Sequence, residues 1–123
     1  MAELVYKDLS YQLNGIFFAV QNKLGTKFQE KHYQKAICSL LKESKIPFQT
    51  EVGFEIKFNE EILGSFRADI LIDNKILIEL KATDGLTIDH KRQVQRYLDA
   101  LNLKLAFLVN FRQRPLQVWR ILN

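Results

Sequence analysis

The first third of the chain places its apolar residues with a helical period. Between about Asp8 and Leu24 they recur every three or four positions, and Gly25 follows where a helix commonly ends. A second apolar stripe continues to about Glu43, after a sequence at Thr26–Gln29 that is typical of a capping box. These patterns predict two consecutive amphipathic helices.

The middle of the chain changes to a period of two. Alternating apolar and polar residues predict a first strand over Phe48–Phe58. Two more strands are expected over Ile62–Ile72 and Ile76–Lys81. Turn-forming residues near 59–61 and 73–75 separate the three strands, which should therefore form an antiparallel meander.

The last third returns to a helix and then to strands. An amphipathic helix is predicted over Ile88–Leu101, followed by strands over Leu103–Phe111 and Leu116–Leu122. The expected order is thus ααβββαββ. Because there is no internal repeat and no candidate linker, we expect one α/β domain over residues 1–123, with a sheet packed against helices.

Composition agrees with a folded α/β protein. The chain has 123 residues, of which 47% are hydrophobic and 26% charged, so it can bury a core without disulfides or structural zinc. Its one cysteine, Cys38, has no partner within the chain, which favours a reducing compartment. The sequence shows neither a signal-peptide pattern nor a membrane-spanning apolar run, and we expect a cytoplasmic protein without a membrane partner.

Charge is unevenly distributed along the chain. Residues 1–85 carry 11 Lys and Arg against 12 Asp and Glu, whereas residues 86–123 carry 7 against 2. A basic surface of this kind is what binding to a polyanion requires, although a solvated basic face without a partner is at least as common.

Residue parity predicts the register of the second hairpin. The even-numbered residues outside the turn are apolar and are expected to share one face: Phe66, Ala68, Ile70, Ile72, Ile76, Ile78 and Leu80. The residue numbers of two facing residues must then add up to an even number. This requires an odd number of residues in the turn, such as the three residues 73–75. In this register Asp69 faces Glu79, with their Cβ atoms about 5 Å apart.

Two facing carboxylates repel each other, so the pair needs an explanation. A divalent cation provides one, because two carboxylates, a backbone carbonyl and water suit Mg²⁺ or Mn²⁺. Lys81 lies on the same face and could position an attacking water or stabilise charge on a phosphate. For this pattern alone, however, the commoner explanation is a wet strand face on which Lys81 and Arg67 neutralise the two acids.

Two helical stretches add candidate site residues. His90, Gln93 and Tyr97 place polar tips on one side of the third predicted helix. Glu30 and Tyr33 share a face near the start of the second, where a carboxylate is electrostatically favoured. Each has a plain structural explanation when taken singly, such as a helix-start role for His90.

As an ordered set, these residues resemble the PD-(D/E)XK nuclease superfamily, and the chain is similar over nearly its full length to the GxxExxY protein family. The residues that carry the resemblance are Tyr6–Ser10, Leu24–Gly25, Phe28, Glu30, Tyr33, Phe66–Asp69, Ile78–Lys81, His90, Gln93, Tyr97–Leu98 and Leu108–Phe111. The resemblance implies a restriction-endonuclease-like αβββαβ core, a mixed sheet flanked by helices.

The same resemblance implies roles for the site residues. Asp69 and Glu79 would bind the metal, with the backbone carbonyl of Leu80 as a third ligand. Lys81 would be the catalytic lysine, and Glu30 would complete the site directly or through water.

The remaining implied site residues lie on the third predicted helix, and one position departs from the pattern. Gln93 and Tyr97 match the QxxxY element of RecB-type exonucleases and would line the site or contact the substrate. The glycine that opens the GxxExxY pattern is Lys27 here, with Gly25 two residues earlier. Lys27 adds positive charge near Glu30.

The implied function is hydrolysis of phosphodiester bonds by a Mg²⁺- or Mn²⁺-dependent nuclease, with DNA favoured over RNA as the substrate. Six basic residues would contact the nucleic-acid backbone without reading its sequence: Lys91, Arg92, Arg96, Lys104, Arg112 and Arg114. A core this small leaves little area for recognition, so we expect low sequence specificity, recognition of a structure or end, or a homodimer.

Two other functions stay open from the sequence. One is a catalytically silent nucleic-acid-binding or regulatory module that keeps the nuclease fold. The other is a protein-interaction subunit in which the acidic pair is structural. Trp119 and Phe111 could stack on bases, although strand alternation favours a core or dimer contact for them.

Overall fold

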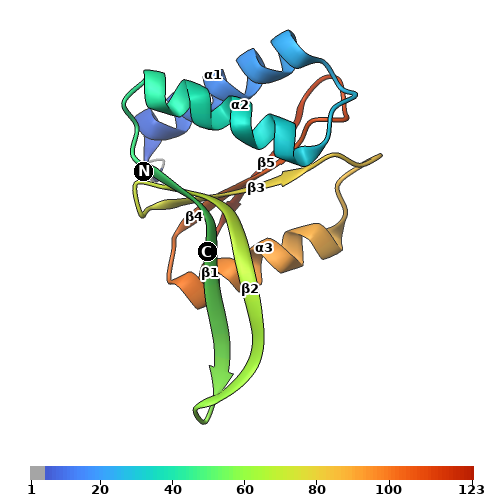
Figure 1. Cartoon of the computed structure of the whole chain (residues 1–123). Helices are drawn as coiled ribbons and strands as arrows, with labels where there is room; N and C mark the ends of the chain where they lie inside the picture. Colours follow the sequence, from blue (N-terminus) through green and yellow to red (C-terminus); the bar gives the residue numbers. More distant parts are fainter. Residues whose placement is uncertain (1–4) are drawn as a thin grey trace, which may run out of the picture.

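The computed structural model describes residues 5–123, and its order of elements is the predicted ααβββαββ (Figure 1). The elements are α1 (Lys7–Leu24), α2 (Glu30–Glu43), β1 (Phe48–Phe58), β2 (Glu61–Ile72), β3 (Ile76–Lys81), α3 (Ile88–Leu101), β4 (Leu105–Asn110) and β5 (Gln117–Leu122). Within residues 5–123, no helix is long and apolar enough to cross a membrane.

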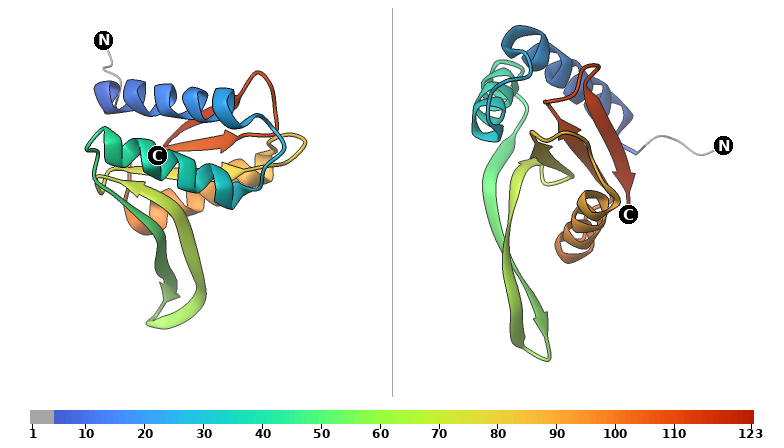
Figure 2. Two further views of the ribbon diagram at one scale, coloured as in Figure 1. Left: turned by 45° about the horizontal axis from the view of Figure 1, so that its top comes forward. Right: turned by 90° about the vertical axis from the view of Figure 1, so that its right-hand side faces the viewer.

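The strands form one mixed sheet in the order β1-β2-β3-β4-β5. β1, β2 and β3 make the expected antiparallel meander, and β4 and β5 are also antiparallel. β3 and β4 are parallel because α3 carries the chain back across the sheet between them. Figure 2 shows α1 and α2 on one face of the sheet and α3 on the other.

The core lies in two layers, one on each face of the sheet. The larger layer packs residues such as Phe17, Ile37 and Phe107 between the sheet and α1 and α2. The smaller packs Val94 and Leu98 of α3 against the other face. Because both faces of β3 and β4 are covered, the polar side chains Glu79 and Asn110 near their carboxyl ends are conspicuous.

The starts of α2 and α3 use the same type of cap. α2 begins with a reciprocal pair between Gln29 and His32, so the expected capping box at Thr26–Gln29 is wrong by one turn. The reason is that residues 25–28 form an irregular connection instead of helix. α3 begins with the equivalent pair between Thr87 and His90, which gives His90 a helix-start role.

The β2–β3 hairpin has the predicted register, with a three-residue turn between Ile72 and Ile76. The expectation that all its even-numbered residues share one face is wrong, however. Ala68 packs in the layer under α3, whereas Ile70 packs in the layer under α1 and α2. The even-numbered side chains of β2 change from one face of the sheet to the other at this point, because β1 and β2 coil strongly. Glu51 of β1, which lies opposite this point, has a left-handed φ of 51°.

The far half of the β1–β2 hairpin extends away from the rest of the molecule (Figure 1). We call residues 53–66 the arm. Its strands remain paired as far as Phe58 and Glu61, and its tight turn has positive φ at Asn59 and Glu60. At its base, Phe54 and Phe66 pack against Tyr97 of α3, with ring centroids 5.0 and 5.7 Å from that of Tyr97.

Candidate functional site

Asp69 lies where β2 separates from β3. The two strands pair from Ile72–Ile76 to Ile70–Ile78, and the ladder ends there. At the next position Asp69 Oδ2 accepts a hydrogen bond of 2.8 Å from the Leu80 backbone N–H. A carboxylate therefore takes the place of a backbone partner and is fixed against the end of β3.

Glu79 is buried next to Asp69, with 4% of its surface exposed. The carboxyl group of Glu79 faces that of Asp69. Burial, and after it the hydrogen bonding and the charge of Asp69, raise the pKa of Glu79 to about 10. Glu79 Oε1 is fully buried and has no hydrogen-bond partner.

Lys81 is tied to α3 on the same side of the sheet. Its Nζ donates to Gln93 Oε1 at 3.4 Å, and Gln93 Nε2 donates to the Tyr97 hydroxyl at 3.4 Å. Burial, and then the charges of Glu79 and Asp69, raise the pKa of Tyr97. The structure thus links the lysine, the amide and the phenol in one chain of polar contacts that begins beside the two carboxylates.

Glu30 approaches the same point from the other face of the sheet, at the first residue of α2. Partial burial raises the pKa of Glu30, while the charge of Lys81 lowers it, as does a hydrogen bond from the Ala82 backbone. The charge of Asp69 raises the pKa again. Glu30 also lines an open hollow of about 440 Å³, together with Lys27, Lys31 and Arg112.

The structure therefore brings together all six side chains that the sequence placed in the site: Glu30, Asp69, Glu79, Lys81, Gln93 and Tyr97. Glu79 and Lys81 come from the end of β3, and Glu30 and Gln93 come from the first two turns of their helices. Tyr97 lies one turn further along α3, and Asp69 lies within β2 where its ladder with β3 ends. The carboxyl end of β3 and the start of the crossover helix meet at one edge of the sheet, and antiparallel β2 brings Asp69 to the same place.

Gln34 and Asn110 also support the site, although sequence reasoning did not select them. Gln34 Nε2 donates to the Asp69 backbone carbonyl at 2.9 Å, which holds β2 where it leaves the ladder. Asn110 accepts from the Thr83 N–H and donates to the Thr83 carbonyl, so it anchors the loop after Lys81. Gln34 lies one helical turn after Glu30, and Asn110 is polar at the end of an apolar run; these were the available signals.

Tyr33, part of the GxxExxY pattern, has a structural role. Its ring is fully buried and stacks on Phe111 at 4.4 Å. Its hydroxyl donates to the Gly25 carbonyl and accepts from the Phe28 N–H. Tyr33 therefore holds the connection before α2 in place and so positions the first residue of α2, Glu30.

The basic residues expected to contact nucleic acid do not all lie at the site. Arg112 is beside Glu30, and Arg96 acts on Tyr97 through its charge. Arg92 is exposed on the first turns of α3, where it pairs with Asp89, and Arg114 is exposed in the β4–β5 loop. Lys91 faces β5, and Lys104 precedes β4 at the opposite end of the sheet, so neither joins this group.

The donor atoms fit a hard divalent cation. Within residues 5–123, no three His, Cys, Asp or Glu side chains gather in a way that could hold a metal, so protein carboxylates alone would not complete a site. Asp69 and Glu79 supply two carboxylates, and the buried Glu79 Oε1 has no hydrogen-bond partner within the same residues. The Leu80 carbonyl lies on the same edge of β3 as the Leu80 N–H, which donates to Asp69, because the N–H and the carbonyl of one strand residue point to the same side.

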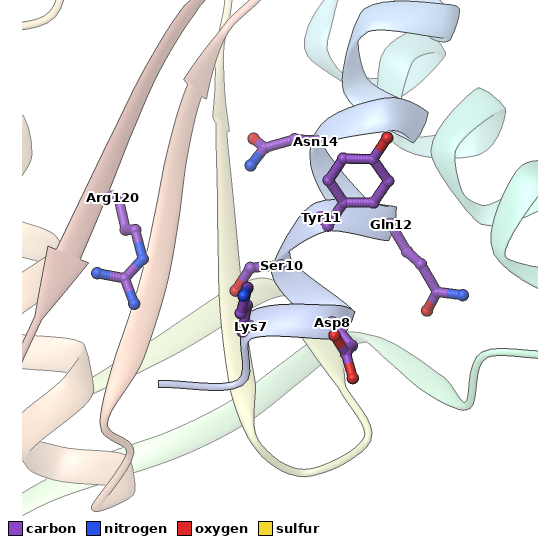
Figure 3. Close-up of a pocket in the computed structure, with 7 residues that line it drawn as sticks. All are labelled: Lys7, Asp8, Ser10, Tyr11, Gln12, Asn14 and Arg120. Carbon is purple, nitrogen blue, oxygen red and sulfur yellow. The ribbon is translucent and has the colours of Figure 1, made fainter. Parts of the chain in front are cut away.

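A larger hollow than the one beside Glu30 lies elsewhere on the surface. It measures about 650 Å³ and lies between α1 and Arg120 of β5, where Lys7, Ser10 and Tyr11 line it (Figure 3). None of the six site residues lines this hollow. The chemistry indicated by the carboxylates is thus at a strand edge and not in this larger hollow.

Comparisons with known proteins identify the superfamily of the chain. A family model described as PD-(D/E)XK nuclease superfamily matches residues 7–121. The solved crystal structure of SSO0001 is similar to this chain, with 28% sequence identity and a TM-score of 0.60 over 76% of the chain. The chain spans about half of that protein, 49% of its length, and no curated protein matches. The match over nearly the whole sequence shows that the chain belongs to the PD-(D/E)XK nuclease superfamily.

Proposed function

We propose that the chain is a metal-dependent nuclease that hydrolyses phosphodiester bonds of DNA, and that one domain over residues 1–123 carries this activity. The observation that supports it best is the buried contact between Asp69 and Glu79, in which Glu79 Oε1 has no hydrogen-bond partner among residues 5–123. An unsatisfied buried carboxylate oxygen is costly unless a cation completes it.

Within the superfamily, we propose membership of the GxxExxY family. The support comes from Glu30 and Tyr33, which lie at the expected spacing and both act at the start of α2. The glycine of the pattern is replaced by Lys27, which lines the hollow beside Glu30 and adds a cation there.

Asp69, Glu79 and the Leu80 carbonyl would hold Mg²⁺ or Mn²⁺, with water and substrate oxygens as the other ligands. A divalent cation bound there would supply activation of water and stabilisation of charge on the leaving oxygen. Asp69 is already oriented by the Leu80 N–H, and its backbone is held by Gln34. Little rearrangement of the protein would therefore accompany binding.

Lys81 would position the attacking water or stabilise the charge that grows on the phosphate. Gln93 accepts from its ammonium group, and Tyr97 orients Gln93. Glu30 lies within reach of the charges of Lys81 and Asp69 and would orient a water at the same edge. These side chains bind and direct protons and water around the two acids.

The substrate backbone would follow the exposed basic residues next to the site: Lys27, Lys31, Arg92, Arg96, Arg112 and Arg114. Charged groups of this kind bind phosphates and do not read bases, so we propose low sequence specificity. Arg92 and Arg112 pair only with the exposed carboxylates of Asp89 and Asp84, which phosphates can replace.

Cleavage assays test the proposal. Linear and circular DNA, single- and double-stranded, and RNA are incubated with Mg²⁺ or Mn²⁺, or with chelator. We expect metal-dependent products from the wild-type protein on DNA and none from Lys81→Met. Lys75→Met is the matched control, since Lys75 flanks the same strand at its other end, pairs with Asp73 and should be dispensable.

A metal titration separates the nuclease from its two alternatives. In calorimetry, wild type and Lys81→Met should bind Mn²⁺ with the same affinity, whereas Asp69→Asn should not bind it. Binding without cleavage of any substrate would favour a silent nucleic-acid-binding module. No binding at all would favour a structural acidic pair, an alternative with its own support because Asp69 accepts the Leu80 N–H.

A further inference from the structure

The tip of the arm exposes large apolar side chains. Phe58, Ile62 and Leu63 are 65%, 56% and 65% exposed, and they are neighbours around the tight turn at Asn59 and Glu60. A two-stranded hairpin that extends alone into water gains little stability from its own contacts. Three exposed apolar residues at its end are therefore a candidate for contact with another surface.

The charge of the arm indicates what kind of surface that is. Residues 53–66 contain three glutamates and one lysine, and two of the glutamates, Glu60 and Glu61, flank the apolar tip. Negative charge at the tip opposes binding to phosphates of nucleic acid or of lipid. It favours a protein surface that is apolar and rimmed by basic groups.

The chain itself has such a surface between α3 and the edge strand β5. A hollow of about 440 Å³ there is walled by Ile88, Val118, Trp119 and Ile121. Ile88 is 57% exposed, and Lys91 adds a positive charge to the lining. Arg120 borders the hollow, but its guanidinium lies on the α1 side of β5 and donates to the Val5 carbonyl. Lys91 is turned toward this hollow and not toward the carboxylates, so the proposed nuclease site leaves it without a role.

We propose that the arm tip of one copy docks into the α3–β5 hollow of a second copy. The apolar side chains of the tip would cover Trp119 and Ile88, and Glu60 and Glu61 would lie against Lys91. Reciprocal exchange of the two arms gives a symmetric dimer in which each contact occurs twice. A symmetric dimer would also place two sites on one substrate, which a core of this size needs in order to cover it.

Sedimentation velocity over a wide range of concentrations tests the proposal on the full chain, without metal or nucleic acid. We expect a reversible dimer in the wild-type protein. Leu63→Ser should weaken dimerisation at least about tenfold, because truncation of a central apolar contact commonly has this effect. Tyr11→Ser is the matched control: Tyr11 is 83% exposed on α1, outside both surfaces, and its loss should not change the dimer.

Charge exchange gives a second test that does not depend on the core. Glu60→Lys with Glu61→Lys should weaken the dimer, as should Lys91→Glu. All three changes in one chain should partly restore it. In addition, equal amounts of the tip variant and the hollow variant should form a mixed dimer, because one of its two contacts is the wild-type pair and the other is the charge-reversed pair.

Circular dichroism spectra and melting temperatures close to wild type would establish that each variant is folded. A monomer at every concentration would overturn the proposal, and so would a dimer indifferent to tip and hollow changes. Loss of DNA binding by Leu63→Ser with an unchanged oligomeric state would also overturn it and reassign the arm to substrate contact. None of these readouts requires nuclease activity, so failure of the dimer and failure of the proposed function are distinguishable.

Discussion

The two ends of the β1–β2 hairpin differ in what they lack. At the end nearer the sheet, Asp69 is held by hydrogen bonds to β3 and α2, and the neighbouring Glu79 of β3 has a buried oxygen without a hydrogen-bond partner in residues 5–123. At the arm tip, Phe58 and Leu63 are exposed and belong to neither core layer of the described residues. The end near Asp69 is preorganised and its carboxylates need a positive charge. The arm tip extends into solvent, and its apolar side chains need an apolar surface to pack on.

One hairpin can serve two purposes because its two halves pack in different core layers of the molecule. The change of face at Asp69 separates them, because residues after it join the layer under α1 and α2. Side chains before it, such as Phe66, pack toward α3 or project beyond the sheet. Mutations at the two ends should accordingly give separate effects on chemistry and on association.

The largest effect is expected for Asp69→Ala, which should reduce metal-dependent cleavage by roughly 10³-fold or more. It also leaves the Leu80 N–H without an acceptor, at a cost of about 1–3 kcal/mol in the free energy of unfolding. Asp69→Asn should lose the same activity yet keep most of the stability, since an amide oxygen can accept that hydrogen bond. Cleavage rates and urea unfolding measure both, and metal-dependent activity in Asp69→Asn would contradict the assignment.

Glu79→Gln should change how stability depends on pH in the absence of divalent cations. The folded protein raises the pKa of Glu79 from 4.5 to about 10, so folding retains a proton that the unfolded chain releases above pH 4.5. Stability of the wild type should therefore fall relative to Glu79→Gln as pH rises from 5 toward 10, by up to about 1.4 kcal/mol per pH unit.

Urea unfolding at several pH values measures the difference in the free energy of unfolding between the wild type and Glu79→Gln. Glu55→Gln on the exposed arm is the control. Saturating Mn²⁺ should reverse the order and make the wild type the more stable protein. A constant gap between wild type and Glu79→Gln from pH 5 to pH 9 would count against a buried carboxyl group that needs a cation.

An intermediate effect is expected for Gln93→Ala. Loss of the amide leaves the Lys81 ammonium free to move, and supporting residues of this kind commonly contribute ten- to hundredfold to activity. Affinity for Mn²⁺ should not change, because Gln93 contacts neither carboxylate in the structure. Tyr97→Phe should reduce cleavage less than Gln93→Ala does, and the opposite order would show that Tyr97 acts independently.

The smallest effect is expected at the arm tip. Phe58→Ser should change the free energy of unfolding of the isolated chain by no more than about 0.5 kcal/mol, since an exposed side chain contributes little to the fold. Calorimetric unfolding at a concentration below that of association measures it. A much larger loss would mean that the tip packs within its own chain.

Much of the fold could be predicted from periodicity. β1, β3 and α3 begin and end at the predicted residues, because alternation and helical spacing are strong there. The boundaries of β4 and β5 differ by one or two residues, and the start of α2 differs more, because Gln29 and His32 form the cap in place of Thr26. A histidine as the returning partner of a cap carries a weaker signal than Glu or Gln does.

The site residues could be proposed from an ordered motif set, but their geometry could not. Parity placed Asp69 opposite Glu79 on a regular ladder, whereas in the structure Asp69 has left the ladder and bonds to Leu80 through its side chain. Coiling of the sheet, which depends on many contacts at once, is not visible in a period of two. For the same reason Gln34, which stabilises this departure, had no signal beyond its spacing from Glu30.

The three-residue turn between Ile72 and Ile76 has a consequence for how related chains can vary in length. One inserted or deleted residue there would slip the pairing, turn a strand over and move Asp69 away from Glu79. Related active chains should therefore tolerate no insertion or deletion of a single residue between these two acids. In a set of homologous sequences, gaps of an odd number of residues should be absent from the turn that follows β2.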